Sequence, residues 1–149
     1  MRSIPLDQLA GLRQHAYHLF ASLLLYPDAE RFGSFPAMAE TLAQGTRSFS
    51  RFAFWNQWDR FVATLRGLSH PERAGLEAEY MRTFTVASEA QPSLAYESAY
   101  MEPQDAGWVM AELDREYAAA GFSLTPEFKA PPDHASVELE FMSLLCGEE

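Results

Sequence analysis

The chain has 149 residues, of which 48% are hydrophobic and 13% aromatic, and this content favours one packed domain over a disordered segment. Its 11 Lys and Arg residues oppose 21 Asp and Glu residues, which makes the formal net charge −10. So acidic a chain is a poor candidate for binding nucleic-acid phosphates or an anionic membrane surface, and a good candidate for binding a basic partner.

The single cysteine, Cys146, can form neither an internal disulfide nor a thiolate zinc site, so a reducing compartment fits best. Residues 1–12 contain no continuous apolar run of the kind found in secretory signals. The longest apolar run, residues 19–26, is interrupted by Ser22 and is too short to cross a bilayer. We therefore expect a cytoplasmic protein that does not insert into membranes.

Apolar side chains at helical spacing predict two helices before Gly45. The first is expected to end shortly before Pro27, and its apolar positions are Leu6, Leu9, Leu12, Ala16, Leu19, Phe20, Leu23 and Leu24. The second is expected to be short, with Ser34 as its N-cap and Gly45 at its end. Its apolar positions are Phe35, Met38 and Leu42.

A third helix is predicted to end at Gly67, with apolar positions Trp55, Trp58, Phe61, Val62 and Leu65. The fourth is predicted to begin with a capping box, in which Ser69 and Glu72 flank a proline in the first turn. Its inward positions are expected to be Leu76, Tyr80, Met81 and Phe84.

Residues 85–102 show neither a helical nor an alternating period, which indicates a long ordered loop of the kind that is usually functional. A fifth helix is expected over about residues 103–120, with Gly121 as its end. Its shared apolar face consists of Trp108, Val109, Leu113 and Tyr117. Residues 122–133 link it to the last helix and form a candidate hinge.

The last helix follows two prolines, which exclude helix before them, and Asp133 stands at the expected N-cap position. Nothing breaks a helix from His134 until Gly147, where the helix is expected to end, and the apolar stripe is Val137, Phe141, Leu144 and Leu145. The helix therefore gathers Asp133, His134 and Glu138 at its N-terminus. This cluster is either an ordinary cap with solvated carboxylates or a functional polar site at the hinge.

The predicted fold class is all-α, an irregular bundle of about six helices in a single domain over residues 1–149. The sequence shows no convincing strand pattern and no internal repeat. A strongly apolar last helix needs partners on several sides, so we expect that the chain lacks a C-terminal helical portion.

Motifs of enzyme chemistry, namely the P-loop, GxGxxG and HExxH, do not occur in the sequence. His15 and His18 are interpreted as packing or surface residues, and His134 with Glu138 supplies only two ligands of a metal site. No general base is predicted next to a candidate nucleophile. We therefore expect no catalytic residue, no metal and no cofactor.

The predicted loop contains two tyrosines around a polar pair, in the order Tyr96, Glu97, Ser98 and Tyr100. Amphipathic, hydrogen-bonding aromatic residues of this kind are enriched at recognition surfaces. The alternative is a loop that is held in place by buried tyrosines. The pattern alone favours neither interpretation.

Several of these motifs together resemble the TorD/DmsD/NarJ family of cytoplasmic redox-enzyme maturation chaperones. They are Tyr80-x-Arg82-x-Phe84, Pro92, Tyr96-Glu97-Ser98-x-Tyr100, Tyr117, Gly121, Pro132-Asp133-His134 and Glu138-Leu139-Glu140-Phe141-Met142. The resemblance implies an all-helical chaperone, not an enzyme, for a molybdenum-cofactor oxidoreductase. Such a chaperone binds the twin-arginine signal peptide and the apo form of the catalytic subunit, assists cofactor insertion and delays export.

The resemblance also implies a signal-peptide site beside the hinge. Its predicted residues are Tyr96, Glu97, Ser98, Tyr100, Trp108, Asp133, His134 and Glu138. Asp133 and Glu97 are the expected partners of the arginines, because bidentate arginine–carboxylate bonds supply both energy and orientation. An aromatic groove that joins Tyr96, Tyr100 and Trp108 to Phe141 is expected to hold the apolar part of the peptide.

Two other functions remain as alternatives. A helical interaction or regulatory module without an export client would bind its partners regardless of an arginine pair. A metal- or nucleotide-dependent enzyme would use Asp133, His134 and Glu138, and the missing ligand clusters weigh against it. A homodimer formed by domain exchange is a further expectation, since exchange across a hinge is a low-cost route to dimers.

Overall fold

The computed structural model describes residues 6–46, 50, 52–85, 95–102, 105–125, 128 and 130–149. In this part of the chain the α-helices are α1 (Leu6–Leu23), α2 (Ala29–Gly45), α3 (Trp55–Arg66), α4 (Arg73–Tyr80), α5 (Ala106–Ala119) and α6 (Ala135–Glu148). Shorter segments are the 3-10 helices η2 (His70–Glu72) and η4 (Glu97–Tyr100) and the π-helical turn η3 (Met81–Thr85). The described residues form one isolated bridge and no longer strand, which confirms the all-α bundle.

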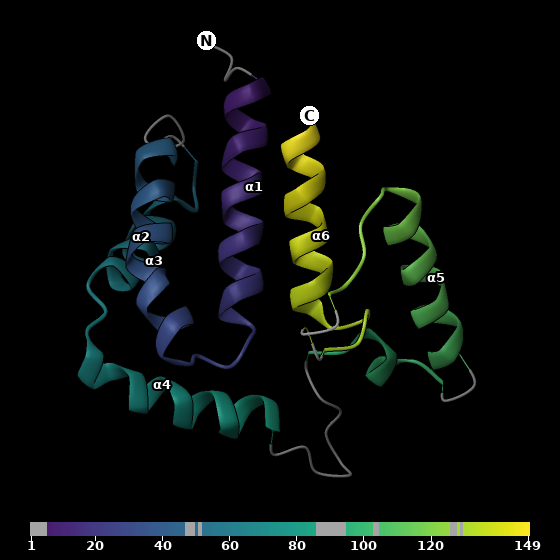
Figure 1. Cartoon of the computed structure of the whole chain (residues 1–149). Coiled ribbons are helices and arrows are strands. Elements are labelled where there is room, and N and C mark those ends of the chain that lie inside the picture. The colour runs from purple at the N-terminus through teal and green to yellow at the C-terminus, as the bar shows by residue number, and fades with distance from the viewer. Residues whose placement is uncertain are drawn as a thin grey trace.

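Helix α1 lies at the centre of the fold, with α2 and α3 on one side and α6 on the other (Figure 1). Helices α1 and α6 are antiparallel, so the beginning of α1 lies beside the end of α6. Helix α4 lies across the ends of α1 and α2, and α5 lies on the far side of α6. The Tyr80 hydroxyl ties the end of α4 to the end of α1, because it donates a hydrogen bond to the Leu24 carbonyl at 3.3 Å.

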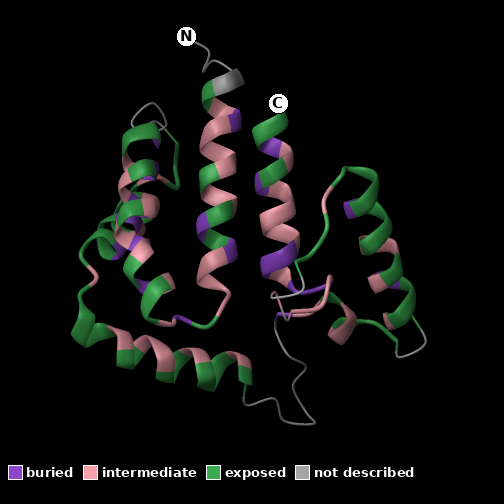
Figure 2. Cartoon of the chain, viewed as in Figure 1, coloured by how far each residue is buried: buried purple, intermediate pink, exposed green. Residues whose placement is uncertain are grey.

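The main hydrophobic core lies where α1, α2 and α3 meet. Its buried residues are Leu19, Phe32, Phe35, Ala39, Leu42, Val62 and Leu65. Figure 2 shows buried and half-buried positions following one another along α1 and α6, while α4 and most of α5 are coloured as exposed or intermediate. Each large apolar side chain that becomes buried contributes roughly 1.5–3 kcal/mol, so this core is the main source of stability.

Small and polar residues allow α1 and α6 to approach closely. The Ser143 hydroxyl donates to the Gln14 carbonyl at 2.9 Å. A Cβ atom at Gly147 would lie 2.7 Å from the Gln14 amide nitrogen Nε2, so the side chain of Gln14 would have to shift. The prediction that Gly147 ends the last helix is wrong, because α6 continues to Glu148.

Helix α2 begins at Ala29, well before the predicted cap at Ser34. The Asp28 carboxylate caps it by accepting a hydrogen bond from the Arg31 N–H at 2.8 Å. Ser34 lies inside the helix, where its hydroxyl donates to the Arg31 carbonyl at 2.7 Å. The predicted cap is therefore wrong. The buried ring of Phe32 extends the apolar face upstream by one turn, which favours the earlier start.

The capping box before α4 and the glycine after α5 agree with the structure, whereas the predicted inward position of Met81 does not. The Ser69 N–H donates to the Glu72 carboxylate at 2.8 Å in the predicted capping box. Gly121 follows α5 with a φ of 80°, as expected for a glycine at a helix end. Met81 was expected to point inward but is 44% exposed. The winding changes from α to π at this residue, which rotates the side chains that follow.

Candidate functional site

Backbone hydrogen bonds join the segment before α5 to the start of α6. Tyr96 and His134 form an isolated antiparallel bridge. The Glu97 N–H donates to the Asp133 carbonyl at 3.0 Å, and the Ala135 N–H donates to the Ala95 carbonyl at 2.7 Å. The candidate site is therefore built where two distant segments of the chain meet, and we call this place the joint.

The Asp133 side chain is 1% exposed and bonds to η4. Its Oδ2 atom accepts a hydrogen bond from the Ser98 N–H at 3.1 Å, whereas its buried Oδ1 atom has no hydrogen-bond partner among the described residues. The prediction that Asp133 caps the last helix is wrong, because α6 begins at Ala135 and His134 takes the cap position. A buried carboxylate oxygen without a donor is costly, so a ligand that supplies one gains binding energy.

His134 caps α6 through its ring. Its Nδ1 atom accepts hydrogen bonds from the Ser136 N–H at 3.1 Å and from the Ser136 hydroxyl at 2.7 Å. A backbone N–H can only donate, so Nδ1 is unprotonated and Nε2 carries the proton of the neutral ring. Burial lowers the pKa of His134, and the Asp133 carboxylate opposes that effect. The Tyr96 ring packs edge-on against the imidazole, with ring centroids 4.9 Å apart.

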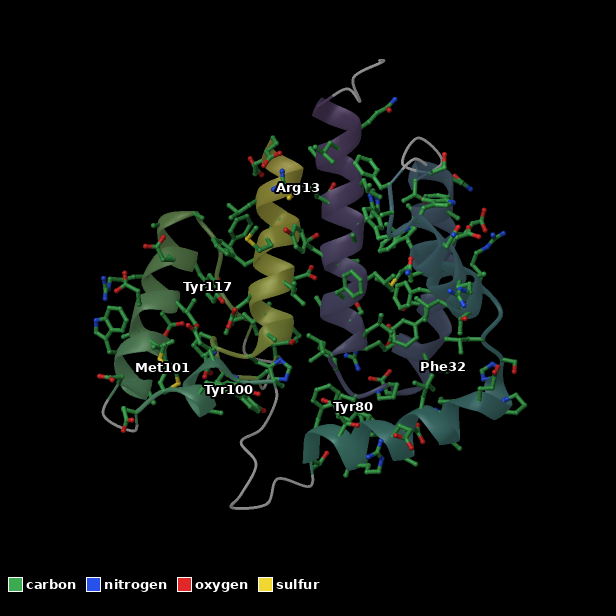
Figure 3. The ribbon with its side chains drawn as sticks, turned by 180° about the vertical axis from the view of Figure 1, so that it is seen from behind. Arg13, Phe32, Tyr80, Tyr100, Met101 and Tyr117 are labelled. Atoms are coloured by element: carbon green, nitrogen blue, oxygen red, sulfur yellow. The ribbon has the colours of Figure 1, made fainter. Side chains whose placement is uncertain are left out.

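Tyr117 reaches the joint from α5, although the sequence analysis did not include it among the predicted site residues. Its hydroxyl donates to the Pro132 carbonyl at 2.9 Å, and its ring packs on Phe141 with centroids 4.7 Å apart. Figure 3 shows Tyr117 between α5 and α6. Burial, together with the charge of Glu138 and of other nearby carboxylates, raises the pKa of Tyr117 to about 12. The sequence signal for this role is weak: a tyrosine on an apolar face needs a hydrogen-bond partner.

Three carboxylates surround the joint: Glu97 on η4, Asp133 before α6 and Glu138 in the first turn of α6. Burial raises the pKa of Glu138, and repulsion by Glu97 and Asp133 raises it further. The ion pairs formed among the described residues include none of these three carboxylates. The described part of the chain therefore leaves the negative charge of the joint without a cation.

The structure separates the predicted site residues into two groups. It brings Tyr96, Glu97 and Ser98 against the segment that precedes α6, as the hydrogen bonds above show. Tyr100 and Trp108 are 61% and 63% exposed. Figure 3 shows Tyr100 beside Met101, near the start of α5. The roles of both groups in peptide binding stay predictions.

A pocket of about 370 Å³ opens next to the joint, between the second half of α1, α6 and the residues that follow α5. Its apolar wall includes Leu25, Phe122, Leu124, Phe128, Phe141 and Leu144. At its edge the His18 ring lies 2.8 Å from the Glu140 carboxylate. Phe141 is the one residue that it shares with the predicted aromatic groove, since Tyr96, Tyr100 and Trp108 do not line it. The pocket forms only when α1 packs on α6, which a helical pattern does not reveal.

Among the described residues, no three His, Cys, Asp or Glu side chains are placed so that they could hold a metal ion. None of the described helices combines the length and the apolar character that crossing a bilayer requires.

The fold is that of the redox enzyme maturation class. A crystal structure of a protein from Archaeoglobus fulgidus, described as a redox enzyme maturation protein, matches with a TM-score of 0.63 and 26% sequence identity. The match covers 89% of this chain and 70% of that one. The chlorate reductase assembly chaperone protein of Ideonella dechloratans is 32% identical over 94 residues, which is 62% of this chain and 48% of the relative.

The family model described as nitrate reductase delta subunit matches residues 37–149, and the chain belongs to this family. The membership confirms the resemblance to the TorD/DmsD/NarJ chaperones that the motifs indicated. The chain spans about half the length of the curated relative that it matches.

Proposed function

We propose that the chain acts as a chaperone in the maturation of a molybdenum-cofactor oxidoreductase. Its family and its similarity to a chlorate reductase assembly chaperone support this role. Both relatives are named for assembly or maturation and not for catalysis, which agrees with a binding function. In its finer form, the proposal is that the chain binds the twin-arginine signal peptide and the apo catalytic subunit in the cytoplasm. It thereby assists cofactor insertion and delays export.

The observation that carries peptide binding is the uncompensated negative charge at the joint. The Oδ1 atom of Asp133 is buried and has no donor among the described residues, which also supply no cation to relieve the repulsion between Glu138 and its neighbours Glu97 and Asp133. A guanidinium group supplies several N–H donors in a planar fork, so it can satisfy Oδ1 and neutralise the repulsion together. A lysine ammonium supplies the positive charge but lacks the planar arrangement of N–H donors.

A guanidinium can reach the Asp133 Oδ1 atom only if the residues that cover this buried atom move, and a movement of η4 is one way to expose it. The movement is opposed by the Ser98 N–H bond to the other carboxylate oxygen and by the bridge between Tyr96 and His134. The exposed rings of Tyr100 and Trp108 offer further contacts to basic residues of the peptide, through cation–π attraction.

A homodimer formed by domain exchange across residues 122–133 is a separate proposal, which rests on the position of this segment between α5 and α6. Light scattering of a dilute solution tests it. A dimer is expected, and a monomer at all concentrations would count against exchange.

Titration with a fluorescent Arg-Arg signal peptide, beside a Lys-Lys version, tests the proposed function. We expect saturable binding of the Arg-Arg peptide that weakens with salt, with lysine substitution and with Asp133→Asn, the last by about tenfold or more. Glu116→Gln removes an exposed carboxylate from α5, so it controls for net charge and should leave binding unchanged. Equal binding of both peptides would favour a general interaction module, and no binding would contradict the proposal.

A further inference from the structure

We propose that the pocket between α1 and α6 receives the apolar side chains that stand next to the arginines of the bound peptide. This inference rests on the proposed function and adds an apolar half to the same site. The bound segment is then recognised by a basic residue and its apolar neighbours together, with the basic residue at the joint.

The pocket has the character of a binding site. Its volume of about 370 Å³ falls within the range of roughly 300–1,000 Å³ that is usual for clefts that enclose ligands. Three phenylalanines, Phe122, Phe128 and Phe141, contribute to its wall. Leu124 and Leu144, which also line it, remain 36% and 39% exposed. Covering this apolar surface removes it from water and favours association.

Tyr117 connects the pocket to the carboxylates. Its ring lines the pocket and packs on Phe141, while its hydroxyl bonds to the carbonyl of Pro132, directly before Asp133. On α6, Val137 lines the pocket one position before Glu138. The charged and the apolar halves are therefore neighbouring parts of one surface, and one short segment can contact both.

The length of the pocket limits which apolar residues it can receive. Its lining on α6 extends from Ser136 to Leu144. These residues span roughly 12 Å at the usual helical rise of about 1.5 Å per residue. An extended peptide crosses that distance in about four residues, at about 3.3 Å each. The pocket therefore serves the residues within about four positions of the arginines and not those further along.

Charge identifies the occupant and its direction. A second copy of this chain would bring another net charge of −10 towards the joint, so its docking there is opposed. A segment that carries arginine beside apolar residues complements both halves. The Glu140 carboxylate at the pocket edge is already engaged by His18, whereas Asp133 and Glu138 at the start of α6 have no cation among the described residues. The arginines therefore lie at that end.

Three fluorescent peptides test the inference. They have the same length and, apart from the basic pair, the same composition. The first has leucines in the four positions after Arg-Arg, the second has serines there and the leucines beyond, and the third repeats the first with Lys-Lys. We expect the second to bind the chain at least about tenfold more weakly than the first, because burial of even one leucine is worth that factor.

Leu144→Glu places a charge in the pocket wall and should weaken binding of the first peptide by at least about tenfold. Leu124→Glu is a second variant, and it lies in the segment that follows α5 and not on α6. Met81→Glu, at an exposed position outside the pocket lining, is the matched control and should bind as the unmodified chain does. Circular dichroism verifies that each variant is folded.

Equal affinity for the first two peptides, with the Arg-Arg preference intact, would overturn this inference and leave the proposed function standing. The same holds if the pocket variants and Met81→Glu weaken binding equally. Loss of the Arg-Arg preference with the leucine effect intact would instead overturn the proposed function and the assigned direction. Failure of every peptide to bind would overturn both.

Discussion

His134 links helix capping to protonation, because the Nδ1 atom that accepts the Ser136 N–H is also the atom that would take up a proton. Burial lowers the pKa of His134 in the folded chain, so the unfolded chain binds the proton more readily. The free energy of unfolding should therefore rise with pH up to the unfolded pKa of about 6.5, and decrease as pH falls towards the folded pKa.

We expect His134→Asn, which retains an N-cap acceptor that does not titrate, to remove this part of the pH dependence. Urea unfolding at about pH 5 and about pH 7.5 measures it, with the exposed His70→Asn as control. An unchanged pH dependence in His134→Asn would show that this ring does not titrate differently in the two states.

Glu138 should be a destabilising residue at neutral pH. Burial and the charges of Glu97 and Asp133 raise its pKa in the folded chain, so its contribution to stability is lost as pH rises through the unfolded value of about 4.3 to the folded one. We expect Glu138→Gln to increase the free energy of unfolding at pH 7 by up to about 1 kcal/mol, with the gain vanishing in acid.

The same substitution should weaken binding of the Arg-Arg peptide, because it removes a carboxylate from the joint. Glu116→Gln on α5 serves as the control in both assays. If Glu138→Gln instead lowered the free energy of unfolding at pH 7, the prediction that burial and repulsion make the Glu138 carboxylate destabilising would be wrong.

At the joint, residue types were easier to predict than their roles. The prolines before Asp133 and His134 indicate that a helix begins near these two residues. Asp133 was predicted to be the N-cap of that helix, because aspartate is the commoner cap residue. The structure gives that role to the His134 ring and bonds Asp133 to the Ser98 N–H. That partner is 35 residues away in the chain, and no local pattern reports such a contact.

At the scale of elements, the start of α2 offers a direct test of two competing cap residues. Asp28→Ala removes the carboxylate that accepts the Arg31 N–H, which should cost about 1 kcal/mol at neutral pH. The hydrogen bond from Arg31, against a smaller effect of burial, lowers the pKa of Asp28, so the cost should disappear as pH falls through the folded pKa.

Ser34→Ala is the matched control, because Ser34 is the cap that the sequence predicted. Its hydroxyl bonds to a carbonyl inside the helix, so its loss should change stability by less than about 0.5 kcal/mol. Thermal unfolding followed by circular dichroism compares the two variants. A larger effect of Ser34→Ala than of Asp28→Ala would place the helix start where the sequence pattern put it.

Helix existence was predictable here because apolar residues recur at helical spacing in every long helix, from α1 to α6. The ends were less predictable. Gly147 has the residue type of a helix end, yet it lies within α6, and the Gln14 side chain of α1 lies where a Cβ atom would stand. The residue type alone does not distinguish a glycine inside a helix from a glycine at its end.

At the scale of the whole molecule, the pocket depends on contacts between parts of the chain that the sequence keeps far apart. His18 and Glu140, which meet at its edge, are 122 residues apart. The apolar stripes of α1 and α6 predicted that both helices are buried, but not that they pack on each other. For this reason Phe141 is the one residue of the expected aromatic groove that lines the pocket, and the pocket itself was not predicted.

A peptide that contacts both α6 and η4 should raise the free energy of unfolding of the whole chain. A ligand present at about one hundred times its Kd adds about 2.7 kcal/mol to the free energy of unfolding, provided that it binds only the folded state. We expect the Arg-Arg peptide with adjacent leucines to raise the melting temperature, and a scrambled peptide that separates the arginines to raise it less. Equal shifts for the two peptides would indicate non-specific association.

The most direct test of the central claim is a double-mutant cycle between the peptide and Asp133. The affinity is measured for the chain and for Asp133→Asn, each with the Arg-Arg peptide and with a peptide in which one arginine is replaced by glutamine. A contact between Asp133 and that arginine predicts a coupling energy of at least about 1.5 kcal/mol, with a value near zero for the control Glu116→Gln. Additive losses at both arginine positions would contradict the claim that Asp133 receives an arginine of the signal peptide.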